Sequence, residues 1–261
     1  MNTSIYRHKA KEILRGRYAE GFFVVSVCIA AYLIFKVFDI AGAGIILYNN
    51  NADISGLFKS GSIAEILLKA VRYILCFIVM SPLITGGLWW FYQTVSGGDN
   101  RSILKLYTGF KLNLRAAFLY GIMWILSMIS LLPSGFCWLL AYKLFYSVSD
   151  FSNQAVILFA VFQLFMAGVF LLGLYLKCLL TFILSPFIFI KHPDTGAFKV
   201  MNMSRKKMYG VKLEFLKMTL AYIPAMLPII TIPFILPKAV MAASVFAEER
   251  LREEQLGKDS T

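Results

Sequence analysis

The chain has 261 residues, of which 59% are hydrophobic and only 15% are charged, with a mean hydropathy of +0.71. A soluble domain usually carries about 25% charged residues, so this composition excludes an ordinary soluble domain and indicates an integral membrane protein. The formal net charge is +12. The cations lie in the gaps between apolar runs, which is typical of a cytoplasmic membrane face rather than of nucleic-acid binding. The length suits a single integral membrane domain over residues 1–261.

Four apolar runs are each long enough to cross the hydrocarbon core of a membrane as a helix. The first covers Gly21–Phe38 and continues in apolar sequence past Asp39. The others lie at about Ile66–Val95, Ala116–Tyr142 and Ala155–Ile190. The fourth run is long enough for one tilted helix that extends beyond the bilayer.

The last apolar stretch, Met218–Phe246, is interrupted by four prolines, at positions 224, 228, 233 and 237. One straight helix cannot hold four prolines without repeated loss of backbone hydrogen bonds. We therefore expect two short helices that break near Thr231–Pro233 and form a tight hairpin. The fold class is then an all-α, polytopic transmembrane helix bundle of about six spans. A single kinked span is the alternative, and it would place the C-terminus on the other side of the membrane.

Basic residues are distributed unevenly between the two sides of this bundle. Of the 26 lysines and arginines, 19 lie in the N-terminal segment, the gaps at 96–115 and 191–217, and the charged tail at 248–261. Five lie on or beside the opposite side. Because cytoplasmic segments carry the excess of Lys and Arg, the N-terminus is predicted to be cytoplasmic, and with six spans the C-terminus is too.

The basic segments 1–20 and 191–217 each also carry an apolar stripe at helical spacing. We expect both to be amphipathic helices that lie on the cytoplasmic leaflet with the apolar side in lipid. Ile103–Leu112 is a candidate for a third, Asp194 or Thr195 can cap the helix in 191–217, and Gly210 is expected to end or bend it. The stripe in 191–217 is Ala197, Val200, Met201, Ser204, Met208, Val211 and Phe215, and the stripe in 1–20 is Tyr6, Ala10, Ile13, Leu14 and Tyr18.

Two sets of polar residues are candidates for function. Cations of the segment 191–217 can bind anionic lipid headgroups or a partner protein, and each contributes about 1 kcal/mol of attraction near an anionic surface. The alternative is that they only anchor the topology. Polar groups inside the spans form the second set, because such groups are costly and often functional. The first set is Lys199, Arg205, Lys206, Lys207 and Lys212, and the second is Gln93, Gln163, Lys177 and Lys238.

Catalytic and metal-binding patterns are absent from the sequence. It contains no Walker loop, no G-x-S-x-G and no H-E-x-x-H motif, and no acidic residue lies centrally in a span. Only two histidines occur, and the four cysteines lie singly inside apolar runs, which favours buried thiols over disulfides or metal ligands. We therefore expect no catalytic residue, no metal and no cofactor.

A weak internal repeat links two parts of the chain. "SILKLYTGFKLN" at 102–113 matches "SRKKMYGVKLEF" at 204–215, and "FIVMSPLI" at 77–84 matches "FILSPFIF" at 182–189. Both copies follow a span that runs in the same direction. The repeat predicts a parallel duplication about an axis along the membrane normal. Chance matching between segments of the same topology is the alternative.

The segment "SPFIFIKHPDTGAFKVMNMSRKKMYGVKLEFLKMTL" resembles the hallmark segment of a bacterial family of multi-pass membrane proteins, domain-of-unknown-function family 975. The matching positions are Pro193, Ala197, Ser204, Met208 and Gly210, with Ala10, Leu14, Gly16 and Tyr18 near the start and "ILPKAVMAASVFAEE" at the end. The stretch 131–180 is longer than the family pattern. The resemblance implies a bacterial cytoplasmic membrane and a topology, and it carries no activity and no catalytic residue.

Three classes of function remain open from the sequence. The leading hypothesis is a non-enzymatic membrane protein of envelope physiology, whose basic cytoplasmic face binds anionic lipid, a partner protein or a second copy. The second is a small-solute or lipid transporter with a pseudo-two-fold bundle. The third, an enzyme, has the least support. A water-filled cavity near Lys177 would favour transport, and a packed bundle would favour binding.

Overall fold

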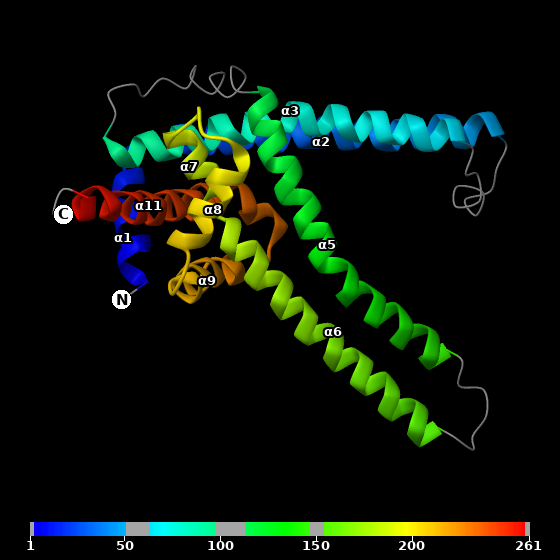
Figure 1. Cartoon of the computed structure of the whole chain (residues 1–261). Helices are drawn as coiled ribbons and strands as arrows, with labels where there is room; N and C mark the ends of the chain where they lie inside the picture. The colour runs from blue at the N-terminus through cyan, green and yellow to red at the C-terminus, as the bar shows by residue number, and fades with distance from the viewer. Residues whose placement is uncertain (1–2, 51–62, 98–112, 147–153, 259–261) are drawn as a thin grey trace.

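The computed structural model describes residues 3–50, 63–97, 113–146 and 154–258, and all regular structure in these ranges is helical (Figure 1). The expected third surface helix, Ile103–Leu112, lies outside the described residues. The helices are α1 (Ser4–Leu14), α2 (Tyr18–Asn50), α3 (Ile63–Ser96), α5 (Asn113–Tyr146), α6 (Gln154–Phe182), α7 (Ser185–Lys191), α8 (Ala197–Lys207), α9 (Lys212–Leu220), α10 (Ile223–Met226), the 3₁₀ turn η4 (Ile229–Thr231) and α11 (Ile232–Lys258).

Four helical stretches of the described chain are long and apolar enough to cross a membrane. They are Tyr18–Phe38, Ala70–Ser96, Leu114–Tyr146 and Val156–Lys191. This confirms the prediction of an all-α chain with four apolar helices of membrane-spanning length in these places. The predicted total of about six is not confirmed, because the proline-rich stretch adds no further helix of this kind in the described residues.

Helix α3 is the central element, because it packs against α2, α5, α7 and α11. Helices α5 and α6 form a long antiparallel hairpin that diverges from α2 and α3 (Figure 1). Of the four apolar stretches, the one in α3 is the most buried, whereas those in α5 and α6 are mostly exposed. Exposed apolar side chains along a helix of this length are typical of a surface that faces lipid.

The fourth apolar run is broken rather than continuous, which differs from the expected single tilted helix. Helix α6 ends at Phe182, and α7 begins at Ser185 with Pro186 in its first turn. A proline inside a continuous helix would lose its hydrogen bond to the carbonyl four residues earlier, which belongs to Phe182. Pro82, by contrast, lies inside the uninterrupted helix α3.

The two amphipathic stripes are buried in protein, so the expectation that they face lipid is wrong. On α1, Tyr6, Ala10 and Leu14 are buried and pack against α11. The ring of Phe246 lies 5.3 Å from that of Tyr6 and 5.2 Å from that of Phe215. On α8 the stripe is likewise buried, against α6 and α7. We call α1, α7, α8, α9 and the C-terminal half of α11 the head.

The turn between α8 and α9 follows the sequence prediction only in part. Gly210 has φ +80° and separates the two helices, so its expected role as a terminator is confirmed. The expected N-cap is wrong, because Gly196 occupies the N-cap of α8 and no side chain caps it. Asp194 instead accepts a hydrogen bond from Arg115 of α5, at 3.2 Å.

The proline-rich stretch folds as a hairpin whose break is confirmed at the predicted place. Helix α11 begins at Ile232, directly after η4. The Thr231 hydroxyl lies 2.5 Å from the carbonyl oxygen of Ala225 and 2.7 Å from that of Pro228, and its one proton can be donated to either. This hydrogen bond stabilises the turn. Pro233 lies in the first turn of α11, where a missing N–H costs nothing. The first arm, α9 and α10, is itself broken between Leu220 and Ile223.

The charged segment expected as a tail from residue 248 is the end of α11. The helix continues to Lys258, and Leu251 is buried. The repeat prediction remains a prediction, since most of its first basic copy, residues 102–113, lies outside the described residues.

Candidate functional site

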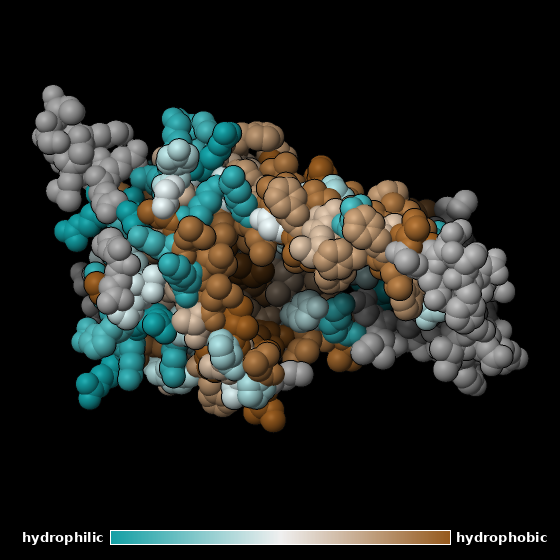
Figure 2. All heavy atoms as spheres, turned by 90° about the horizontal axis from the view of Figure 1, so that it is seen from below, coloured by the Kyte–Doolittle hydropathy of each residue, from teal (hydrophilic) through white to brown (hydrophobic). Residues whose placement is uncertain are grey.

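Helix α8 separates its apolar and basic residues onto opposite sides. Opposite the buried stripe lie Phe198, Lys199, Asn202, Arg205, Lys206 and Tyr209, all of them exposed. We call these six residues the α8 basic face. Figure 2 shows many hydrophilic residues towards the end of the molecule that carries the head, and mainly hydrophobic residues in the middle of that view.

Aromatic side chains flank the cations of the α8 basic face. Phe198 is 70% exposed and Tyr209 is 87% exposed. The ring of Phe198 lies edge-on to that of Phe118 in α5, with 6.4 Å between the centroids. The apolar stretch of α5 begins at Leu114, so Phe198 lies at the level where that helix would enter the membrane. Aromatic rings beside cations are typical of a membrane–water interface.

Two of the five predicted cations have a different environment, because both are half-buried and bonded within the protein. Lys207 Nζ donates to the carbonyl of Arg250 at 3.3 Å, near the end of α11. Lys212 Nζ donates to the Thr181 hydroxyl at 2.5 Å. The structure therefore divides the predicted set into three exposed cations, Lys199, Arg205 and Lys206, and two that hold the head together.

The end of α11 is fixed in the head by further polar contacts. Arg250 forms an ion pair with Glu214 of α9 at 3.1 Å, and its guanidinium lies 5.6 Å from the centre of the Phe246 ring. Lys191 Nζ donates to the carbonyl of Leu251 at 3.5 Å. These contacts join the C-terminal half of α11 to α7 and α9.

The four intramembrane candidates do not come together. Lys177 and Gln163 lie on α6 with exposed side chains, and Gln93 is half-buried near the end of α3. Lys238 is exposed on α11, and its ammonium lies 5.5 Å from the centre of the Tyr18 ring. Lys238 also lines a polar cavity.

That cavity has a volume of about 560 Å³ and lies between α1, the start of α2 and α11. Its polar lining residues are His8, Lys11, Glu12, Arg15, Tyr18 and Lys238, and we call it the basic cleft. The sequence reasoning missed it. Lys11 and Arg15 are four residues apart, which places them on one side of α1, but no sequence pattern joins them to Lys238, more than 200 residues later.

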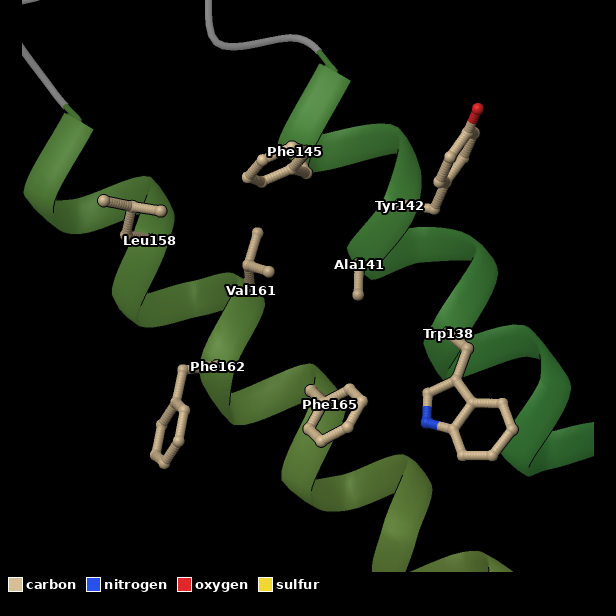
Figure 3. Close-up of a pocket in the computed structure, with 8 residues that line it drawn as sticks. All are labelled: Trp138, Ala141, Tyr142, Phe145, Leu158, Val161, Phe162 and Phe165. Carbon is tan, nitrogen blue, oxygen red and sulfur yellow. The ribbon is translucent and has the colours of Figure 1, made fainter.

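The other cavities are apolar. A groove of about 460 Å³ lies between α5 and α6, and the rings of Trp138 and Phe165 stack across it with centroids 6.5 Å apart (Figure 3). A second cavity, of about 260 Å³, lies between α3, α5 and α6, and none of its lining residues carries a charge. Apolar walls of this kind can hold hydrocarbon but offer no acid–base or ion-binding chemistry.

Within the described ranges, no three His, Cys, Asp or Glu side chains lie close enough together to hold a metal ion. The four cysteines are half-buried thiols. No family model, no curated protein and no solved structure matches the chain.

Proposed function

We propose that the protein is a non-enzymatic membrane protein of the bacterial cytoplasmic membrane, whose α8 basic face binds anionic phospholipid headgroups. One observation carries the proposal: Lys199, Arg205 and Lys206 are exposed on one side of α8, between exposed aromatic rings, beside the start of the apolar stretch of α5. Cations attract anionic headgroups, and aromatic rings anchor at the same depth. The proposal includes membership of domain-of-unknown-function family 975, which the sequence resembles, and a role in envelope physiology.

The topology that fits this role has four crossings and both termini in the cytoplasm. The first arm of the proline hairpin, residues 212–226, would be roughly 22 Å long even as one continuous helix. That length is short of the roughly 30 Å of hydrocarbon. The hairpin then enters and leaves the membrane on the cytoplasmic side. Six spans, with the hairpin crossing fully, is the alternative.

A small-solute or lipid transporter is the second candidate function. It would need a polar path near the centre of the bundle. The cavity between α3, α5 and α6 has no charged lining residue, and the side chain of Lys177 is exposed on α6. These observations favour binding over transport.

The lipid-binding proposal is tested by removing the three exposed cations together, in Lys199→Gln/Arg205→Gln/Lys206→Gln. At about 1 kcal/mol for each cation, the affinity for phosphatidylglycerol should fall about 100-fold at low salt. The measurement is native mass spectrometry of the full-length protein titrated with phosphatidylglycerol or phosphatidylcholine in detergent. Binding of phosphatidylcholine should not change.

The matched control removes the same charge from the spans, in Lys36→Gln/Lys143→Gln/Lys177→Gln, and should keep the wild-type affinity. All three of these side chains are exposed. If the α8 variant folds and binds phosphatidylglycerol as the wild type does, the α8 basic face does not bind lipid. Loss of a co-purified acidic protein with unchanged lipid affinity would favour a protein partner instead.

A further inference from the structure

The basic cleft holds more positive charge than its surroundings balance. Lys11, Arg15 and Lys238 all line it. The one carboxylate in the lining, Glu12, lies 3.5 Å from His8. Within the described part of the chain, the three cations form no ion pair with an acidic residue. Three like charges that line one cleft repel one another.

The helix dipole explains only part of this arrangement. Lys11 lies in the last turn of α1 and Arg15 directly follows it, so both face the negative end of that helix dipole. Lys238 comes from the second turn of α11, nearer the positive end of a different helix. Its ammonium lies over the ring of Tyr18, whose hydroxyl donates to the carbonyl of Phe234. The fold thus brings a third cation to the cleft, held over an aromatic ring rather than by a carboxylate.

The position of the cleft relates it to the membrane. Tyr18 lines the cleft and is also the first residue of the apolar stretch of α2. A separate apolar cavity, of about 290 Å³, begins about two turns further along α2. Its lining residues include Val25, Ile29, Leu236 and Val240. Helices α2 and α11 contribute to the walls of both cavities. A polar site at the start of the apolar stretch of α2, with an apolar cavity further along that helix, suits a phospholipid.

We propose that the basic cleft is a second lipid site, in which Lys11, Arg15 and Lys238 bind the phosphate of one anionic phospholipid. The guanidinium of Arg15 can donate two parallel hydrogen bonds to phosphate oxygens, and the two ammonium groups act as point charges. The volume of about 560 Å³ accommodates a headgroup larger than a bare phosphate ion. This inference rests on the proposed function only for the placement of the protein in a membrane, since it uses none of the residues of the α8 basic face.

The test uses the full-length variant Lys11→Gln/Arg15→Gln/Lys238→Gln and, as a matched control, Lys9→Gln/Lys217→Gln/Arg252→Gln. The control removes three exposed cations from the head outside the cleft. Phosphatidylglycerol in mixed micelles should raise the melting temperature of the wild type and of the control. The cleft variant should show a smaller rise, because only the α8 basic face is left to bind this lipid, and the affinity of the cleft itself should fall about 100-fold. Without lipid, it should melt no lower than the wild type, because the repulsion has been removed.

Three outcomes overturn the inference. The first is a cleft variant that folds and is stabilised by phosphatidylglycerol as the wild type is. The second is an equal loss in the control, which would show that any three cations suffice. The third is a wild-type rise that glycerol phosphate alone reproduces, since the source would then be a soluble phosphate.

A variant with Arg15→Lys alone keeps the charge and should lose only part of the affinity. The cleft variant could bind lipid as the wild type does while the α8 variant loses binding. The proposed function would then stand, and the inference about the cleft would be wrong.

Discussion

Glu214 and Arg250 form the ion pair that joins α9 to the end of α11. Their side chains are 27% and 14% exposed. Replacing Glu214 by Gln leaves a poorly solvated guanidinium, so we expect the free energy of unfolding to fall by about 2 kcal/mol. The measurement is unfolding of the purified protein in detergent, with the wild type as reference.

The control is the exposed pair between Arg115 and Asp194, whose side chains are 64% and 98% exposed. Asp194→Asn should change the stability by no more than about 0.5 kcal/mol, because solvent screens such pairs. Equal effects of the two substitutions would show that burial of the Glu214–Arg250 pair does not matter.

Gly168 allows α5 and α6 to approach closely. A Cβ at this position would lie 2.2 Å from Nε1 of Trp138 (the indole shown in Figure 3), and the Ser134 hydroxyl donates to the Gly168 carbonyl at 2.9 Å. Gly168→Ala should therefore lower the melting temperature and cost about 1–3 kcal/mol, because the indole must leave its contact.

Gly173, on the same helix, is the matched control for Gly168, since a Cβ there meets nothing within 4 Å. Gly173→Ala should leave stability unchanged or slightly higher, as alanine favours a helix. The double variant Gly168→Ala/Trp138→Leu should recover part of the loss. Equal melting temperatures for the Gly168→Ala and Gly173→Ala proteins would contradict the close contact.

At the scale of elements, hydrophobic periodicity predicted the helices but not their partners. The stripe of Tyr6, Ala10 and Leu14 specifies that one side of α1 avoids water, and lipid and protein satisfy that requirement equally well. The partner is α11, whose apolar side chains around Phe246 are more than 200 residues away. Contacts of such sequence separation leave no local pattern, so the prediction that the apolar stripes of α1 and α8 face lipid was wrong.

Prolines and glycine were the most reliable local signals. The break before Ile232 and the end of α8 near Gly210 were both predictable, because a missing N–H and a positive φ act locally. Pro82 and Pro186 read alike in sequence, yet only the second coincides with a break. Residues around both prolines are buried, so burial does not explain this difference.

The candidate site was predictable as a segment but not residue by residue. Charge counting singled out Lys199, Arg205 and Lys206, which are exposed, together with Lys207 and Lys212, which are half-buried and bonded internally. All five look equivalent in sequence. They differ because α11 packs beside Lys207 and α6 packs beside Lys212. A single sequence does not show which helices pack together.

At the scale of the whole molecule, the two ends of the chain lie together. Figure 1 shows the N- and C-termini at the same end, and α1 packs along α11. If the four apolar stretches cross a membrane, we expect the head, with the α8 basic face and the basic cleft, to lie on one side of it. The account depends on that placement, because both proposed sites bind headgroups of a single leaflet.

Cysteine labelling tests this placement most directly. Single cysteines are placed at Ser4, Lys206, Arg252, Ile230 and Tyr146 in a protein whose four native cysteines are replaced. A membrane-impermeant maleimide added to intact cells should label only Tyr146→Cys, at the far end of α5. It should label Ser4→Cys, Lys206→Cys and Arg252→Cys only in inverted membrane vesicles. Labelling of Ile230→Cys in intact cells would show that the hairpin crosses fully, as in six spans. Labelling of Arg252→Cys in intact cells would contradict the account, because the C-terminus would then lie on the opposite side from the N-terminus.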